Sequence, residues 1–215
     1  MSQLPTDSDG VWECFIVGGL FAVCLVAAGI WRRFSWTQHP PLGIVLLLSR
    51  TKPLEASALA AAFSRVTGTT FQVITPQGGR RVAPADVPEG DAVLGEPPSF
   101  LVKAQGDLFL VNNVAKPYIL GRKGAGSGVD DVHLAEALKE HQAWLSVEIL
   151  HPEAVSSSNY RVVGQAIAEL LSTECLALFH PESRKLVAVV PSETLGKLRT
   201  SHPINAVFGV PLGLS

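Results

Sequence analysis

An uncharged run near the N-terminus constrains this chain more than any other feature. From Cys14 to Trp31 the sequence reads CFIVGGLFAVCLVAAGIW, eighteen residues without Lys, Arg, Asp or Glu. At about 1.5 Å of rise per residue, a helix of this length is close to the thickness of a bilayer's hydrocarbon core. Trp12, Trp31 and Trp36 flank the run, where amphipathic rings prefer the headgroup layer. The run therefore predicts one transmembrane helix over residues 14–31.

The residues on either side of the run predict how the chain is oriented. A cleaved signal peptide would need a basic N-terminal region, but residues 1–13 contain Asp7, Asp9 and Glu13 and no Lys or Arg. Arg32 and Arg33 follow the run directly, and basic residues favour the cytoplasmic side. We therefore expect an uncleaved, single-pass protein of the cell membrane, with its N-terminus outside and its C-terminal part in the cytoplasm.

Small residues on the predicted span raise the question of self-association. Gly18 and Ala22 are four residues apart, a spacing that lets a second helix pack closely and would allow a weak homodimer. Small residues are also common in transmembrane helices that do not dimerise. Both interpretations therefore remain open.

The span divides the chain into four predicted parts. Residues 1–13 form a short acidic tail, 14–31 the transmembrane helix, 32–41 a juxtamembrane linker, and 42–215 a soluble domain. The last part is long enough for one domain with its own core. The whole chain is 47% hydrophobic and 17% charged, which is typical of a folded protein rather than a disordered one.

Charge and cysteine content exclude two classes of partner. The chain has 17 basic and 19 acidic residues, and no more than two Lys or Arg are adjacent, so we expect no nucleic-acid partner. Its 3 cysteines, Cys14, Cys24 and Cys175, form no CxxC pair and have no metal-ligand spacing. We therefore predict neither a metal site nor a cofactor.

The pattern of apolar residues after position 42 predicts the fold class. Apolar or β-branched runs bounded by Gly and Pro indicate strands, and helical spacing of apolar residues indicates helices. The predicted strands cover residues 43–48, 69–75, 100–104, 108–112, 143–150, 176–179 and 186–190. The predicted helices cover 54–66, 130–141, 159–172 and 192–200, and Pro76 to Pro98 reads as an irregular surface excursion. Hairpins mixed with helices predict an α+β fold, a mixed and largely antiparallel sheet with helices packed on it.

Parts of residues 135–193 resemble a known group of protein domains. The matching pieces are Glu140-His141-Gln142-Ala143, the strand from Leu145 to Ile149, and Val189-Val190-Pro191. Together they resemble an uncharacterised family of bacterial α+β domains of unknown function, in which a helix ends at a His before a strand. The resemblance implies the fold and no particular activity.

The acid, base or metal-binding candidates are a few His and Glu residues, because imidazole and carboxylate groups exchange protons and bind metals. They are His141, Glu148, His151, His180 and Glu182, of which His141, Glu148 and His180 are the first catalytic candidates. None forms an HExxH motif. His141 at a helix end would also be favourable beside carbonyl groups, and His151 and His180, each before a proline, also read as exposed turn residues.

Three further features have structural explanations that we favour. The segment 121–128, GRKGAGSG, lacks the Gly-Lys-Ser/Thr ending of a phosphate-binding loop and reads as a flexible linker. Ser156-Ser157-Ser158 precedes a predicted helix and suits capping. Trp144, on a predicted strand, suits the core better than a ligand platform.

These observations leave three hypotheses for function. The first is a membrane-anchored, cytoplasmic α+β domain that acts as an interaction or regulatory module. The second is a membrane-bound enzyme, such as a hydrolase, that uses His141 with Glu148 or His180. The third is a structural element of a membrane complex.

Overall fold

The computed structural model describes residues 42–75, 88–118, 131–150 and 157–210. All of them belong to one compact unit. Within these ranges, no helix has the length and apolar character needed to cross a bilayer. The predicted span over residues 14–31 lies outside the described residues, as do the segment 121–128 and His151.

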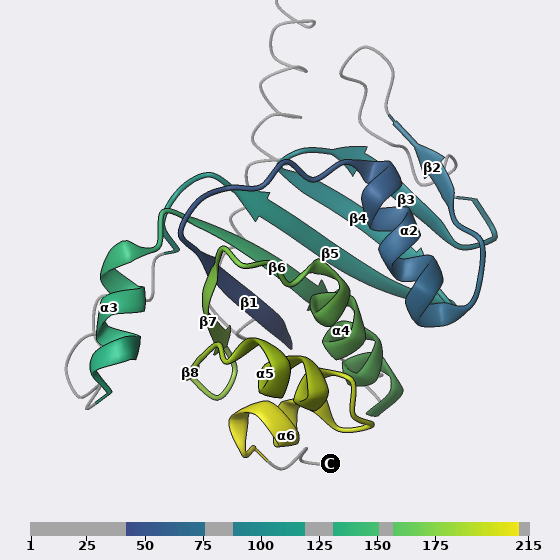
Figure 1. The fold of residues 1–215 in the computed structure, drawn as a ribbon. Helices are drawn as coiled ribbons and strands as arrows, with labels where there is room; N and C mark the ends of the chain where they lie inside the picture. Colours follow the sequence, from purple (N-terminus) through teal and green to yellow (C-terminus); the bar gives the residue numbers. More distant parts are fainter. Residues whose placement is uncertain (1–41, 76–87, 119–130, 151–156, 211–215) are drawn as a thin grey trace, which may run out of the picture. The chain divides into compact units, whose positions relative to one another are not determined.

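The described residues form one mixed sheet with helices packed on it (Figure 1). The strand order is β2-β3-β4-β5-β6-β1-β7-β8; β2 and β3 are parallel, and the other neighbouring pairs are antiparallel. This arrangement confirms the predicted α+β class and sheet type. The strands are β1 (Leu42–Leu48), β2 (Gln72–Ile74), β3 (Ala92–Glu96), β4 (Ser99–Ala104), β5 (Asp107–Val114), β6 (Ala143–Ile149), β7 (Cys175–His180) and β8 (Lys185–Ala188).

Helices pack on both faces of the sheet, but unequally. One face, here called the helical face, carries the main core and the helices α2 (Ala56–Thr67), α4 (Ser157–Leu170), α5 (Pro191–Leu198) and α6 (Pro203–Phe208) (Figure 1). The opposite face, here called the second face, carries α3 (Val132–Glu140), which contacts β7 and β8. A smaller apolar cluster lies between α3 and the sheet.

Strand β1 lies inside the sheet, between β6 and β7, and is buried on both faces. Ile44 and Leu46 belong to the core of the helical face, whereas Val45 and Leu47 belong to the cluster on the second face. All four side chains are 0% exposed. Burial on both faces explains why this strand reads as a continuous apolar run rather than an alternating one, and it confirms the predicted strand at 43–48.

Helix α2 confirms the predicted helix over 54–66, with small shifts at its ends. Leu59 and Phe63 are buried on the inward side of the helix. Gly68 follows in the left-handed conformation, with φ at 74°, and its N–H donates to the carbonyl of Ser64. Glycine adopts this conformation without steric cost, which explains why the helix ends here.

Strand β3 corrects the prediction that residues 76–98 are irregular. Residues 88–91 are irregular, but Ala92–Glu96 forms a strand that pairs with both β2 and β4. Prolines and glycines on either side obscured a short apolar run of Ala, Val and Leu. The strand is stabilised by its pairing with β2 and β4 rather than by the strand propensity of its own residues.

Helix α3 confirms the predicted helix over 130–141, although it begins two residues later than predicted. Asp131 caps the helix, and its carboxylate accepts from the N–H groups of His133 and Leu134. Val132, at the start of the helix, is 67% exposed. Leu134, Ala137 and Leu138 face the cluster on the second face.

The C-terminal helices are the part that the sequence predicted least well. The predicted helix over 192–200 is α5, Pro191–Leu198, but α6, Pro203–Phe208, was not predicted. Six residues are too few for a helical period to be recognised. Gly164 of α4 lies where a Cβ atom would be 2.5 Å from the Pro203 ring, so the absence of a side chain there allows α6 to pack closely against α4.

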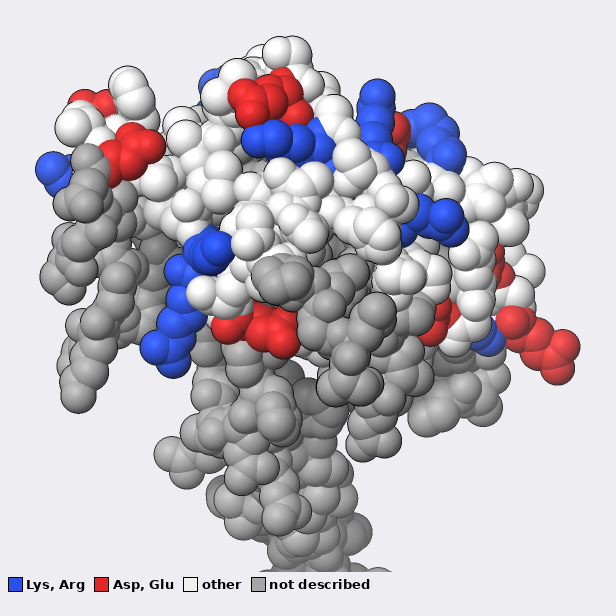
Figure 2. All heavy atoms as spheres, turned by 90° about the horizontal axis from the view of Figure 1, so that it is seen from below, with Lys and Arg blue, Asp and Glu red and all other residues white. Residues whose placement is uncertain are grey.

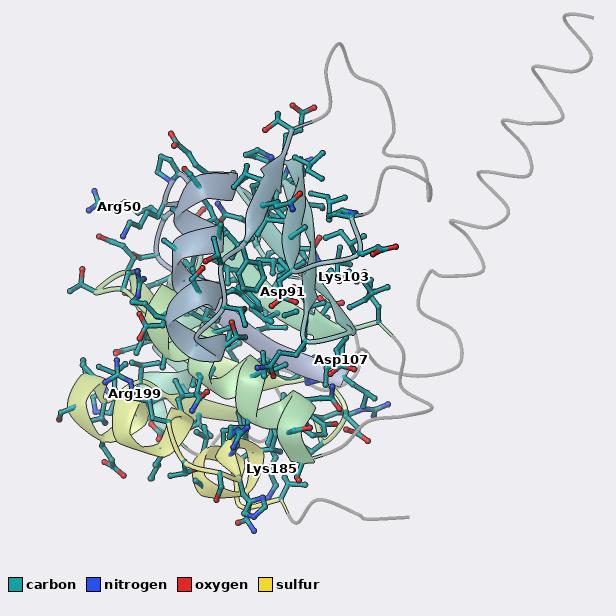
Figure 3. All side chains as sticks on the ribbon, turned by 90° about the vertical axis from the view of Figure 1, so that its right-hand side faces the viewer. Arg50, Asp91, Lys103, Asp107, Lys185 and Arg199 are labelled. Carbon is teal, nitrogen blue, oxygen red and sulfur yellow. The ribbon has the colours of Figure 1, made fainter. Side chains whose placement is uncertain are left out.

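Polar contacts between side chain and backbone join the loops at one end of the sheet. Asp91 accepts from the Thr69 hydroxyl at 2.5 Å and from the N–H of Gln105 at 2.7 Å. Lys103 donates to the carbonyls of Pro88 and Glu89, both at 2.8 Å. Figure 3 shows Asp91 and Lys103 at this end. These bonds fix the turns that lead into β3 and β5, which carry part of the second face.

Candidate functional site

A line of polar side chains crosses the second face of the sheet through β4, β5 and β6. We call Ser99, Asn112, Ser146 and Glu148 the Glu148 network. Ser99 Oγ donates to Asn112 Oδ1 at 2.7 Å, and Asn112 Nδ2 donates to Ser146 Oγ at 3.2 Å and to Glu148 Oε1 at 3.4 Å. Ser146 Oγ donates to the same carboxylate oxygen at 2.6 Å.

Strand register explains why these four residues meet. Ser99 lies opposite Asn112, and Asn112 lies opposite Ser146. Side chains alternate between the two faces of a strand, so the residues between them point to the core of the helical face, as Val111 and Val147 do. The network is therefore a cross-strand ladder built from polar residues at alternate positions of otherwise apolar strands.

Glu148 is the ionisable member of the network and is largely buried. Burial raises the pKa of its carboxyl group, while the hydrogen bonds from Ser146 and Asn112 act in the opposite direction. Among the described residues, no Lys or Arg forms an ion pair with it. A carboxylate that is desolvated and held by neutral donors costs folding free energy when ionised, which is common at binding and catalytic sites.

An aromatic group lies next to the network on the same face. The Tyr118 ring meets Trp144 edge-on at 5.1 Å between centroids and lies 5.8 Å from Phe179. Burial, and in addition the charge of Glu148, raises the pKa of Tyr118 to about 12. Trp144 is half-buried within the cluster on this face, as the core interpretation of this residue expected.

His141 fixes the position of Tyr118 through the backbone. Its Nε2 accepts from the Tyr118 N–H at 3.1 Å, and its Nδ1 donates to the Leu138 carbonyl at 2.8 Å. This pattern places the ring proton on Nδ1. His141 follows the last residue of α3, as predicted, and both of its nitrogens are used by backbone groups. It therefore acts as a positioning residue for the aromatic group.

His180 lies on the other side of the sheet, in a second polar cluster. It was expected as an exposed turn residue, but its side chain is 2% exposed, because α6 covers it and the Phe208 ring lies 5.3 Å away. The missed helix is the reason for the wrong prediction. Burial lowers the pKa of His180 to about 4. Lys185, opposite His180 in β8, donates to the Phe208 carbonyl at 3.0 Å and lies beside α6 (Figure 3).

The contacts of His180 include a serine and a glutamate, as a hydrolase triad does. Ser183 Oγ lies 2.7 Å from Nδ1, and Glu182 lies 3.9 Å from Nε2 and accepts from the Tyr160 hydroxyl. Nε2 has no hydrogen-bond partner among the described residues. The Ser183 N–H also points at Nδ1, which makes this a local turn contact. An imidazole whose pKa is about 4 is a weak base at neutral pH, so the cluster does not suit nucleophile activation.

The structure does not bring the three predicted catalytic candidates together. His141 and Glu148 are seven positions apart on a nearly extended chain, which corresponds to about 20 Å. Glu148 faces the second face, whereas His180 packs beside Phe208 on the helical face, so the sheet separates them. Within the described ranges, Tyr118 connects two of them: its backbone N–H donates to His141, and its hydroxyl group feels the charge of Glu148.

Metal and thiol chemistry have no visible basis in the described ranges. No group of three or more His, Cys, Asp or Glu residues there could hold a metal ion. Cys175 is buried, and burial raises the pKa of its thiol to about 12, so it is a core residue rather than a reactive one.

The charges on the described surface do not favour one type of binding partner. Figure 2 shows basic and acidic side chains interspersed among uncharged ones over the described part of one face. Some of the charges pair across elements: Glu169 of α4 accepts from Arg65 of α2 at 2.7 Å and from Arg199 after α5 at 3.2 Å. The expectation of no nucleic-acid partner remains a prediction from the sequence.

Comparisons with protein-family models, curated proteins and solved structures find no significant match. The resemblance of residues 135–193 to an uncharacterised bacterial family therefore stays a prediction, and the site is interpreted from its own geometry.

Replacing Glu148 by Gln tests whether its ionised form costs stability. The pKa of Glu148 is higher in the folded than in the unfolded state, so ionisation opposes folding above the unfolded pKa. We expect the full-length variant to unfold at a higher temperature than the wild type at pH 7 to 8, with a difference that shrinks towards pH 4. Thermal unfolding in detergent micelles measures this, and a variant less stable at pH 8 than the wild type would contradict it.

The buried His180 should make the folded unit less stable in acid. Its pKa is about 4 in the folded protein, against about 6.5 in an unfolded chain, so the unfolded state binds the proton first. We expect stability to fall between pH 6.5 and pH 4, by on the order of 3 kcal/mol. The His180→Gln variant should lose this pH dependence in chemical unfolding. His133→Gln, which changes an exposed histidine, serves as the control and should keep it.

Proposed function

We propose that this chain is a single-pass membrane-anchored protein whose folded unit, residues 42–215, acts on the cytoplasmic side as an interaction or regulatory module. The anchor is assigned to residues 14–31 from their length, lack of charge and flanking tryptophans. The orientation is assigned from Arg32 and Arg33. The bilayer is thus one partner, and a protein on the cytoplasmic side is the other.

The main support for an interaction function is the second face of the sheet over β3, β4 and β5. Leu101 and Leu110 point to this face, are half-buried, and belong to neither apolar cluster of the described residues. Within the described chain, the helix on this face is α3, which contacts β7 and β8 at the other end of the sheet. A partly apolar sheet face beside a polar network is suited to binding another protein.

The alternative of a membrane-bound hydrolase receives less support. Its proposed residues, His141 with Glu148 or His180, lie at different places, and the nitrogens of His141 hold backbone groups. The proposed weak homodimer through Gly18 and Ala22 is compatible with the module, because the two surfaces are in different parts of the chain.

A reporter fused after Ser215 tests the orientation. An enzyme that is active only in the cytoplasm should be active in the full-length fusion, and one that requires export should not. Moving Arg32 and Arg33 to the N-terminal side of residues 14–31 should weaken or reverse this preference. Activity of the exported reporter on the unaltered chain would contradict the proposal.

Photo-crosslinking tests the binding face. A photoreactive amino acid at Leu110 of the full-length protein, in its native membranes, should form discrete adducts with another protein. The same substitution at Ala61, an exposed residue of α2 on the helical face, is the matched control and should not form them. Identical adducts from both positions, or none from Leu110, would count against a module that binds through the second face.

A further inference from the structure

We infer that the Glu148 network is the specificity element of the second face, and that it receives an arginine or lysine side chain of a protein partner. This inference rests on the proposed interaction function and names the chemistry of the partner. Its three supports are the unpaired carboxylate, its surroundings and its position in the sheet.

The carboxylate has acceptor capacity that no other residue in the described part of the chain uses. The hydrogen bonds from Ser146 and Asn112 both go to Oε1, and among the described residues no Lys or Arg pairs with the group. Two other glutamates of the unit are paired with arginine: Glu174 accepts from Arg50 and Ser49, and Glu169 accepts from Arg65 and Arg199. Because a partly buried anion is stabilised most by a cation, charge complementarity selects a basic group as the occupant.

The surroundings of Glu148 suit the long side chain of a basic residue. Leu110 lies opposite Glu148 on β5, and Gly43, which has no side chain, lies opposite it on β1. Apolar carbon atoms can therefore contact the methylene groups of Arg or Lys while the charged end meets the carboxylate.

The position of Gly43 is required by the backbone as well. A Cβ atom at this residue would be 2.2 Å from the carbonyl oxygen of Val147, so β1 and β6 could not approach as they do. The absence of a side chain beside Glu148 is thus built into the pairing of the two strands. The carboxylate is flanked by a side chain on β5 and by none on β1.

The network also limits the orientations that the Glu148 carboxylate can adopt. Ser146 is 0% exposed, and its hydroxyl holds Oε1 at 2.6 Å. Asn112 accepts a hydrogen bond from Ser99 and donates one to Glu148. The orientation of the carboxylate therefore depends on residues of β4 and β5 as well as on β6. A preorganised acceptor loses less entropy on binding than a flexible surface glutamate does, and it favours a geometrically specific partner.

A peptide-binding experiment on the full-length protein in detergent micelles tests the inference. The probe is a short fluorescent peptide of alternating leucine and arginine, compared with the same peptide carrying neutral citrulline in place of arginine. We expect the arginine peptide to bind the wild type about tenfold or more tightly than the citrulline peptide, and Glu148→Gln to abolish most of that difference. Glu96→Gln, which changes an exposed glutamate on β3, is the matched control and should preserve it.

Each other outcome is informative. Equal binding of both peptides to the wild type would overturn the inference without requiring any variant to fold. An equal loss in the Glu148 and Glu96 variants would overturn it in favour of diffuse electrostatic attraction. Competition by choline as effective as the arginine peptide would overturn it in favour of a lipid headgroup. In all three cases, specific adducts at Leu110 would leave the proposed interaction function standing.

Discussion

Strand β1 hydrogen-bonds to β6 on one side and to β7 on the other, and its side chains are buried on both faces of the sheet. Every other element is placed relative to this strand. The five strands from β2 to β6 attach through its pairing with β6, and β7 and β8 attach through its pairing with β7. The helical core and the smaller cluster under α3 both include its residues. The two sides of the sheet are thus held together by one apolar strand.

The candidate site depends on this arrangement, because the pairing of β1 with β6 sets the surroundings of Glu148. The register places Gly43 beside the carboxylate, and the same backbone approach excludes any larger residue there. Across the sheet, Ser99, Asn112 and Ser146 meet because three antiparallel strands are in register. A polar ladder in this position costs more to desolvate than an apolar one would. The proposed binding role would account for a ladder that does not favour stability.

Much of the fold followed from the sequence, and the exceptions have physical causes. Strong local signals predicted β1, α2 and the β4–β5 hairpin, because each has a long apolar pattern or a glycine where the backbone requires one. Strand β3 and helix α6 depend on neighbours that sequence periodicity does not reveal. Glu148 was chosen as an ionisable residue, but Asn112, Ser146 and Tyr118 were not. Polar residues alternating with apolar ones in β5 and β6 were the signal, and only the cross-strand register joins them.

The central place of β1 also bears on how the protein is made. Leu46 pairs with Leu145 and with Leu178, so neither neighbour of this strand exists when the strand itself leaves the ribosome. Long-range pairings of this kind form late, and unpaired apolar strands associate readily with other chains. Cotranslational folding can complete the hairpins first, but the sheet closes only after most of the polypeptide has been synthesised. The segment Ile44 to Leu48 therefore remains without its strand partners until most of the polypeptide has been made.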